Sequence, residues 1–417
     1  MSRPYLPRIA DRQLEARLSA IGAVLIEGPK ACGKTATATR QAGTMIRFDQ
    51  DPAARTLLEL DPVALFTGEP PILFDEWQLA PGIWDWVRRE VDDRGLRGQF
   101  LLTGSATPRD NARRHSGAGR IGRLRMRPMS LFETGHSTGV VSMHALLQGE
   151  SQRGEAKDLE FQDLLERIVI GGWPDLIDAD EATAVQWLTD YLAQLIEVDI
   201  PDMGHRRNPR ALTRLLASLA RGVGQAVKAS EISADVGGAD GPVASETLSG
   251  YLDALARLGI IDNSEAWLPH MRSRSRLRSA AVRYFVDPSL GPAALGVGTA
   301  ALRADPRAAG FHFEALALRD LRVYAEPLSG SVDSWRDSNG HEIDAVVSLR
   351  DGSWAAFEVK LNPAAIDEAA ASLLRFAAKV DTERHGKPAA LCVITGFGHA
   401  GRRADGVHVI PITALGP

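Results

Sequence analysis

A glycine-rich segment near the N-terminus is the feature that most constrains how this chain can fold. It reads Gly28-Pro-Lys-Ala-Cys-Gly33-Lys34-Thr35 and matches the pattern G-x-x-x-x-G-K-[ST] at every position. An apolar run over residues 23–26 precedes it, and a helical pattern follows it. In this setting the glycines let backbone N–H groups surround phosphate oxygens, and the helix N-terminus adds a positive dipole. The segment therefore predicts the phosphate-binding loop of a P-loop NTPase.

Within this loop, two side chains and the backbone have different predicted tasks. Lys34 is expected to reach the β- and γ-phosphates, and the Thr35 hydroxyl is expected to hold Mg²⁺. The remaining positions contribute mainly backbone. The predicted nucleotide-binding residues are Gly28, Pro29, Lys30, Ala31, Cys32, Gly33, Lys34 and Thr35.

A pair of acids, Asp75 and Glu76, ends a second apolar run. Asp75 is predicted to bind Mg²⁺ through water, and Glu76 is predicted to polarise the attacking water. A separate glutamate beside the Mg²⁺ aspartate favours hydrolysis over transfer to a small molecule. The predicted ligands are ATP and Mg²⁺, with adenine as the default because no guanine-reading N-K-x-D motif is present.

Residues 1–135 alternate short apolar runs with helical stretches, which predicts an α/β domain with a parallel sheet. Thr103 or Ser105, after the fourth run, is expected to lie beside the γ-phosphate. The predicted strands cover residues 23–26, 45–48, 72–74 and 100–102, with an edge strand over 123–127.

Arg120 is a candidate arginine finger, acting in its own chain or from a neighbouring one. The alternative is a solvated surface arginine, because five other arginines crowd the same region: Arg109, Arg113, Arg114, Arg125 and Arg127.

Residues 160–290 are predicted to be mostly helical, after a polar linker over residues 139–159. Helical patterns over 211–221, 229–236 and 245–258, followed by β-like runs over 260–262 and 282–286, match a winged helix. Its third helix carries one arginine and two acids, a poor match for DNA. A basic run after it would track phosphates, or the module serves only protein packing. The run contains Arg272, Arg274, Arg276, Arg278 and Arg283.

Residues 305–417 return to an α/β pattern and carry a second candidate site. Asp344 ends one strand pattern, while Glu358 and Lys360 share a face of the next strand because they are two residues apart. This is the arrangement of PD-(D/E)xK nucleases, in which two carboxylates hold a divalent metal and the lysine helps to position a water. Glu314, on the preceding helix, resembles the extra acidic residue of such sites. The alternative is an ordinary Glu-x-Lys pair on a surface strand. The strand around Glu358 is apolar, however, and unpaired buried charges are costly.

In their order and spacing, these motifs resemble a large prokaryotic family of AAA-type ATPases that carry a C-terminal domain of unknown function. The resemblance covers nearly the whole chain and implies an ATPase core, a helical middle with a winged helix, and a restriction-nuclease-like end. The motifs that carry it, besides the phosphate loop, are Asp75-Glu76-Trp77-Gln78, Leu102-Thr-Gly-Ser105, Gly119-Arg120, Met129-Ser-Leu-Phe-Glu133, Gly171-Gly-Trp-Pro174, Asp199-Ile200, Tyr284-Phe-Val-Asp287, Phe313-Glu314, Glu342-Ile-Asp344 and Phe357-Glu-Val-Lys360.

The composition restricts how this chain could bind nucleic acid and where in the cell it is expected. A formal net charge of −5 argues against coating nucleic acid through a global field, although a local basic face remains compatible with it. Only two cysteines occur, and no apolar run approaches the length of a membrane span, so a cytoplasmic protein without membrane contact is expected.

The predicted function is Mg²⁺-dependent ATP hydrolysis used as a switch on the other two domains. The switch would gate DNA binding or processing, or it would act in a signalling or toxin–antitoxin-like scaffold that binds a protein partner without cutting. A small-molecule kinase is the least favoured alternative. DNA, a protein partner and a second copy of the chain are the candidate partners. The predicted fold class is α/β: a P-loop NTPase parallel sheet, then a helical and winged-helix middle, then a restriction-nuclease-like α/β domain.

Overall fold

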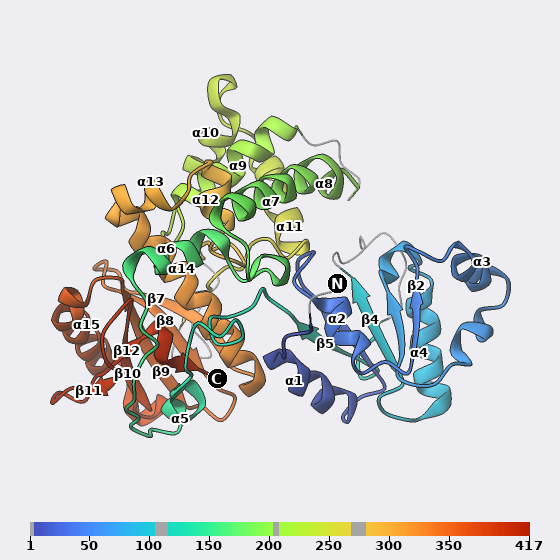
Figure 1. The fold of residues 1–417 in the computed structure, drawn as a ribbon, viewed down its shortest axis with the longest axis horizontal. Coiled ribbons are helices and arrows are strands. Elements are labelled where there is room, and N and C mark those ends of the chain that lie inside the picture. The colour runs from blue at the N-terminus through green and yellow to red at the C-terminus, as the bar shows by residue number, and fades with distance from the viewer. Residues whose placement is uncertain (1–3, 105–115, 203–207, 268–280) are drawn as a thin grey trace. The chain divides into compact units, whose positions relative to one another are not determined.

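The computed structural model describes residues 4–104, 116–202, 208–267 and 281–417, which fall into two compact units. The first unit comprises Met1–Pro128 and Ala254–Ile260. The second comprises Met129–Asp253 and Ile261–Pro417. Helices of the middle region and the C-terminal sheet thus belong to the same unit (Figure 1).

The first unit is built on a five-stranded sheet with the order β2-β3-β4-β1-β5. Every neighbouring pair in this sheet is parallel, and β5 is an edge strand, which confirms the predicted α/β parallel sheet. Its elements are α1 (Ile9–Leu18), β1 (Ala23–Glu27), α2 (Lys34–Thr39), β2 (Thr44–Arg47), α3 (Pro52–Leu60), η1 (Pro62–Phe66), β3 (Ile72–Asp75), η2 (Trp77–Leu79), α4 (Ile83–Arg94), β4 (Phe100–Gly104) and β5 (Ile121–Arg125).

Aromatic side chains fill one face of this sheet. Phe66 from η1 packs 5.3 Å from Phe74 and 5.4 Å from Phe100, measured between ring centroids. All three rings are buried, so they hold β3 and β4 against the helices that cover them. Residues 72–74 and 100–102 are continuously apolar because these strands belong to a parallel sheet that is covered on both faces.

The second unit begins with a group of helices. The three helices expected from the winged-helix pattern are present as α9, α10 and α11, and the β-like runs after them meet only through isolated bridges, Ile261 with Phe285 and Ser264 with Val282. The winged-helix arrangement itself stays a prediction. The helices are α6 (Phe161–Ile170), α7 (Glu181–Gln194), α8 (Ile200–Asp202), α9 (Pro209–Arg221), α10 (Ala229–Gly237), α11 (Ser245–Arg257), α12 (Leu290–Leu295) and α13 (Thr299–Ala304).

The same unit contains a six-stranded mixed sheet with the order β11-β12-β10-β9-β8-β7. Strands β9 and β10 run parallel, and β8 is antiparallel to β9. Strand β7 escaped the sequence analysis, because its alternation is interrupted by a register shift between Asp333 and Trp335. The elements are α14 (Pro306–Ala325), β7 (Ser331–Arg336), β8 (Glu342–Ser348), β9 (Trp354–Lys360), α15 (Ile366–Lys379), α16 (Thr382–His385), β10 (Ala390–Thr395), β11 (Gly401–Arg402) and β12 (His408–Pro411).

The expected linker over residues 139–159 is wrong, because part of this segment belongs to the core of the second unit. Strand β6 (Val141–Ser142) pairs in parallel with the C-terminal strand β13 (Leu415–Gly416), and helix α5 (Met143–Leu147) follows. Met143, Leu146 and Leu147 are buried at helical spacing within an otherwise polar sequence. A short apolar stripe of this kind is easily missed beside its polar neighbours.

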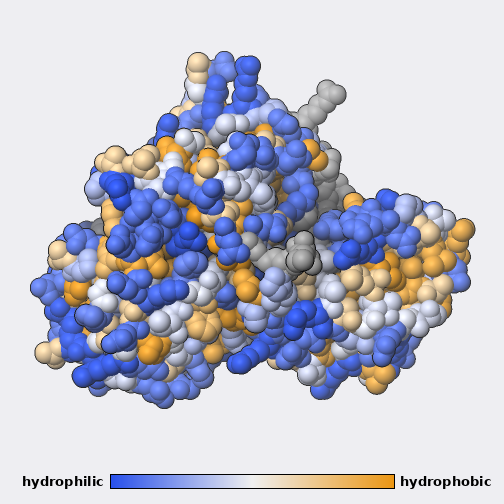
Figure 2. All heavy atoms as spheres, viewed as in Figure 1, coloured by the Kyte–Doolittle hydropathy of each residue, from blue (hydrophilic) through white to orange (hydrophobic). Residues whose placement is uncertain are grey.

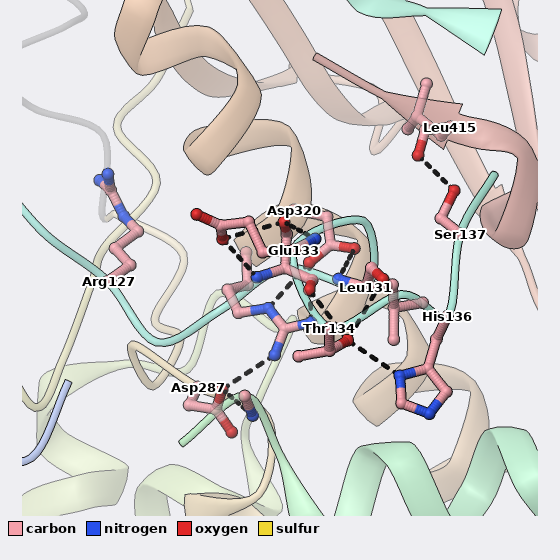
Figure 3. Close-up of polar contacts among 12 residues, drawn as sticks. Arg127, Leu131, Glu133, Thr134, His136, Ser137, Asp287, Asp320 and Leu415 are labelled. Atoms are coloured by element: carbon pink, nitrogen blue, oxygen red, sulfur yellow. Dashed lines mark hydrogen bonds and ion pairs between the residues drawn. The ribbon is translucent and has the colours of Figure 1, made fainter. Parts of the chain in front are cut away.

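A buried ion network ties distant segments of the second unit together (Figure 3). On α14, Arg319 lies between two carboxylates, donating to Asp287 at 2.9 Å and to Asp320 at 2.8 Å. Asp287 also accepts from the Gly172 N–H at 3.0 Å, and Asp320 accepts from the Leu131 N–H at 3.1 Å. The three charged side chains are nearly inaccessible to solvent, so each depends on the others for compensation.

Among the described residues, no helix is both long enough and apolar enough to cross a lipid bilayer.

We expect Asp287→Ala to lower the free energy of unfolding by about 3–5 kcal/mol, because it leaves a buried guanidinium partly unpaired. Urea denaturation followed by circular dichroism measures this loss. The control is Glu342→Ala, which removes an exposed partner of Arg336 at 2.9 Å and should cost less than about 1 kcal/mol. Equal losses for the two variants would show that the network contributes no more than a surface pair.

Candidate functional site

The phosphate loop connects the carboxyl end of β1 to α2, as the sequence predicts. Its backbone is left-handed at Ala31, with φ of 60°, and at Gly33, with φ of 99°. A Cβ atom at Gly28 would lie 2.3 Å from the carbonyl oxygen of Met126, so this position requires glycine. The loop is therefore shaped by close backbone approaches and by unusual dihedral angles, as expected for a peptide that surrounds an anion.

Lys34 is the first residue of α2, and its side chain turns back over the loop. Its Nζ donates to the carbonyl oxygens of Gly28 at 3.0 Å and Pro29 at 2.7 Å. The side chain is buried, which limits its freedom and places the ammonium group over the loop. The predicted contact of this lysine with phosphate oxygens is compatible with this placement.

The next residue, Thr35, contacts the acid that ends β3. Its hydroxyl donates to Asp75 Oδ1 at 2.8 Å, and the hydroxyl of Thr103, at the end of β4, donates to the same oxygen. In the sheet register Asp75 lies beside Thr103. Hydroxyl and carboxylate oxygens are ligands that suit Mg²⁺, so this group of side chains fits the predicted ion. Ser105, the other residue expected here, lies outside the described residues.

Glu76 has a left-handed backbone, with φ of 52°, at the turn between β3 and η2. Burial raises the pKa of its carboxyl, while the hydrogen bond from Gln78 and the charge of Lys34 act in the opposite direction. Gln78 donates its amide N–H to Glu76 Oε2. A Cβ at Gly104 would lie 2.3 Å from Gln78 Oε1, so the glycine after Thr103 makes room for this contact.

Gln78 is a residue whose role the sequence analysis did not assign. It holds the Glu76 carboxylate from two positions further along the chain. The signal was present in Asp75-Glu76-Trp77-Gln78, but only the turn geometry shows that the amide folds back onto the glutamate.

Arg120 lies at the opposite end of the strands from the phosphate loop, in the same sheet. It immediately precedes β5, whose Ile121 is in register with Ala23 at the amino end of β1. The phosphate loop leaves the carboxyl end of β1, about 13 Å further along this five-residue strand at about 3.3 Å per residue. Arg120 instead pairs with Asp92 at 2.8 Å. As an arginine finger for its own loop, Arg120 is therefore wrong, and a role toward a neighbouring chain stays a prediction.

The structure brings three of the four residues of the predicted C-terminal site into direct contact. Lys360 Nζ lies 2.7 Å from Glu358 Oε2 and 3.5 Å from Asp344 Oδ2. Asp344 also accepts from the Val359 N–H at 2.7 Å, and Glu358 accepts from Ser372 Oγ, on α15, at 2.8 Å. Glu314 is held separately, by a hydrogen bond of 2.5 Å from the Tyr284 hydroxyl.

Burial and the charges of neighbouring side chains together shift the pKa values of three residues in this cluster. Burial and the charge of Asp344 raise the pKa of Glu358 to about 7, against the lowering effect of Lys360. The pKa of Glu314 is raised well above its usual value, first by burial and then by Asp344. Burial would lower the pKa of Lys360, but the charges of Asp344 and Glu358 outweigh it and raise that pKa. Across the described ranges, no set of three or more His, Cys, Asp or Glu side chains is arranged to hold a metal ion.

Most of the basic run after the third helix of the winged-helix pattern lies outside the described residues. Arg272, Arg274, Arg276 and Arg278 lie outside the described residues. Arg283 is half-buried and donates to the carbonyl oxygen of Val227 at 3.2 Å, and its contact with phosphates stays a prediction.

Three family models match parts of the chain. A family model described as an AAA domain matches residues 21–135. Residues 161–301 and 309–415 match two further models, both described as domains of unknown function. The first match supports residues 21–135 as a P-loop domain of the AAA type, and it accords with the geometry of the loop and its acids.

The relatives and solved structures are distant. Uncharacterized proteins of Mycobacterium bovis and Mycobacterium tuberculosis are each 26% identical over 362 residues, which cover 85% of this chain and 73% of theirs. A Walker-type ATPase of Pyrococcus abyssi is 15% identical with a TM-score of 0.43, covering 70% of this chain and 99% of that one. A RuvB variant of Thermotoga maritima is 16% identical with a TM-score of 0.26, covering 61% and 88%.

The raised pKa of Glu358 predicts a pH-dependent stability difference. A carboxyl with a pKa near 7 in the folded chain and 4.5 in the unfolded chain favours folding when protonated, so its contribution is lost as the pH rises from about 4.5 through 7. We expect the free energy of unfolding of Glu358→Gln, relative to the wild type, to increase over this window. Urea denaturation in EDTA at several pH values measures the difference, with Glu342→Gln as the control. A difference that does not change with pH would contradict the raised pKa.

Proposed function

We propose that this chain hydrolyses ATP with Mg²⁺ at the first unit and uses hydrolysis as a switch on DNA binding or processing by the second. The observation that carries the proposal is the group of side chains at the carboxyl ends of β1, β3 and β4. Lys34 lies over the loop, Thr35 hydrogen-bonds Asp75, and Glu76 follows at the turn. The AAA-domain match over residues 21–135 supports ATP as the nucleotide.

In this mechanism each residue has a separate task. The backbone of residues 28–33 and the Lys34 ammonium bind the phosphates. Thr35 and Asp75 would hold Mg²⁺, which neutralises charge on the β- and γ-phosphates when it is bound. Glu76 accepts a hydrogen bond from the attacking water and orients it. Gln78 positions Glu76, and its N–H donation favours the ionised carboxylate that this task requires.

For the second unit, we propose a nuclease-like site formed by Asp344, Glu358 and Lys360, with Glu314 nearby. Asp344 and Glu358 both contact the same ammonium group, so they are close enough to share a cation. Their oxygen atoms suit Mg²⁺ or Mn²⁺. In the structure, the positive charge of Lys360 compensates the charges of these two carboxylates. A bound metal ion would take over part of this charge compensation.

The alternative function is a scaffold that binds a protein partner, or a second copy of the chain, without cutting. It is favoured by apolar side chains on the surface of the first unit, where α3 buries only Ala54. Leu60 is 79% exposed and Val63 is 54% exposed. Figure 2 shows hydrophobic surface over the part of this unit that contains α3. An exposed apolar area of this kind is typical of an interaction surface.

For the ATPase, we expect Glu76→Gln to bind MgATP nearly as the wild type does and to hydrolyse it at least about 100-fold more slowly, because the water loses its acceptor. Lys34→Ala should weaken binding about tenfold or more, because a charge-assisted phosphate contact is lost. Fluorescent-nucleotide binding and phosphate release measure the two effects, with the exposed Glu59→Gln as control. Hydrolysis by Glu76→Gln at the wild-type rate would refute the role of Glu76.

For the nuclease-like site, we expect Mn²⁺ to raise the thermal midpoint of the nucleotide-free full chain by roughly 2 °C or more, because the ion binds the folded state. Asp344→Asn should abolish this shift, while Thr35→Ala should retain it. Differential scanning fluorimetry with and without Mn²⁺ makes the comparison. If no shift depends on Asp344, the scaffold alternative is favoured.

A further inference from the structure

A cavity of about 530 Å³ opens beside the proposed nuclease-like site of the second unit. The first turns of α14 form one wall, and the end of β9 with the following turn forms another. Its volume lies within the usual range for a small-molecule pocket. The aromatic and polar side chains that line it are Phe161, Phe311, Phe397, Arg307, Glu314, Lys360 and Asn362. Glu314 accepts a hydrogen bond from Tyr284, and burial raises its pKa well above the usual value, which favours its neutral form.

The cavity lies where a parallel pair of strands ends. Strands β9 and β10 run parallel, and their last registered pair is Lys360 with Thr395. Phe397 follows β10 by two residues, and Asn362 follows β9 by two. Ligands of α/β proteins bind in the crevice outside the carboxyl ends of such strands, because the connecting loops diverge there.

Aromatic rings give the cavity an apolar wall. Phe161, at the first turn of α6, meets Phe397 edge to face with centroids 6.2 Å apart. Phe161 is 36% exposed, so its ring is available at the opening rather than filling a core. Phe311 contributes a third ring from α14. A planar ring of a ligand would stack on or between these side chains.

Positive and amide groups lie at the edge of this aromatic wall. The guanidinium of Arg307 lies 5.9 Å from the centroid of the Phe311 ring, and Lys360 lines the cavity on the β9 side. Asn362, held by the hydrogen bond that its Oδ1 accepts from the Ala364 N–H at 3.0 Å, adds an amide side chain. An apolar slot next to cations matches a ligand that joins a planar ring to an anionic group.

We propose that this cavity binds one nucleotide unit, with the base among the phenylalanine rings and its phosphate at Arg307. The neighbouring phosphodiester of a strand would then lie toward Lys360 and the Asp344–Glu358 pair. The inference rests on the proposed nucleic-acid function of the second unit. It adds to that function a preference for an unpaired base, since the edges and faces of a paired base are occupied.

Binding of a fluorescein-labelled single-stranded oligothymidylate to the full chain tests this assignment. The titration is followed by fluorescence anisotropy in EDTA, which prevents cleavage. We expect the unlabelled oligomer to compete at least about fivefold better than an abasic oligomer of equal length and charge, because stacking of the bases is lost. Competition by thymidine monophosphate would indicate a free nucleotide, whereas competition by the oligomer alone would indicate a strand. Either result supports a nucleotide site.

Two variants with matched controls locate the binding. Phe161→Ala should weaken oligomer binding about fivefold or more, whereas Phe132→Ala, a ring of similar exposure (38%) elsewhere in the same unit, should not. Arg307→Gln should lower the slope of log affinity against log salt by about 0.7, and Arg303→Gln should leave it unchanged. Equal binding of the abasic oligomer, or an unaffected Phe161→Ala, would overturn the proposal, as would failure of both the oligomer and the mononucleotide to bind.

Phosphate release measured on the same samples separates this proposal from the ATPase. ATP hydrolysis that depends on Lys34, without base-dependent binding, would refute the cavity assignment alone. Base-dependent binding that Phe161→Ala weakens, without hydrolysis, would support the cavity assignment and refute the ATPase.

Discussion

Three parallel strands, β1, β3 and β4, end side by side, and this register brings together side chains that are distant in sequence. Thr35 and Asp75 are 40 residues apart and Asp75 and Thr103 are 28 apart, yet both hydroxyls donate to the same carboxylate oxygen. The register depends on apolar strands that are covered on both faces, so the core of the first unit and its candidate site have the same origin. A slip of one residue in β3 would turn Asp75 away from Thr35 and remove the contact. The candidate nucleotide site is therefore a consequence of strand pairing as much as of the loop motif.

The second unit depends on a different constraint, because its buried charged side chains must be paired with opposite charges. Arg319 binds Asp287 and Asp320, and these acids in turn accept N–H groups from residues 172 and 131. The segment that follows the first unit is held in place by this network rather than by apolar packing alone. Glu314, five residues before Arg319 on α14, and the Asp344–Glu358–Lys360 cluster show the same kind of compensation on a smaller scale. In both clusters the burial of charge costs free energy, and the charged contacts fix the relative positions of the side chains.

Much of the fold follows from sequence patterns, while several parts of the sites depend on three-dimensional contacts. The apolar runs at residues 23–26, 72–74 and 100–102 gave the strands of the first sheet, because buried parallel strands have a continuous apolar sequence. Helix α5 was missed because its apolar stripe is short, and β7 because a register shift interrupts it. Arg120, a candidate arginine finger in its own chain or from a neighbouring one, precedes β5 at the amino end of β1, and spacing along the chain does not reveal at which end of the strands a residue lies. Gln78 was not assigned a role because its contact with Glu76 depends on a left-handed turn.

The proposed function couples ATP hydrolysis in the first unit to nucleic-acid chemistry in the second. The most direct measurement is the steady-state rate of phosphate release by the full chain with MgATP, with and without single-stranded and duplex DNA. We expect hydrolysis that is lost in the Lys34→Ala variant and that rises when DNA is added. A rate that is the same with and without DNA would contradict the coupling, and the absence of hydrolysis would contradict the proposed ATPase function itself.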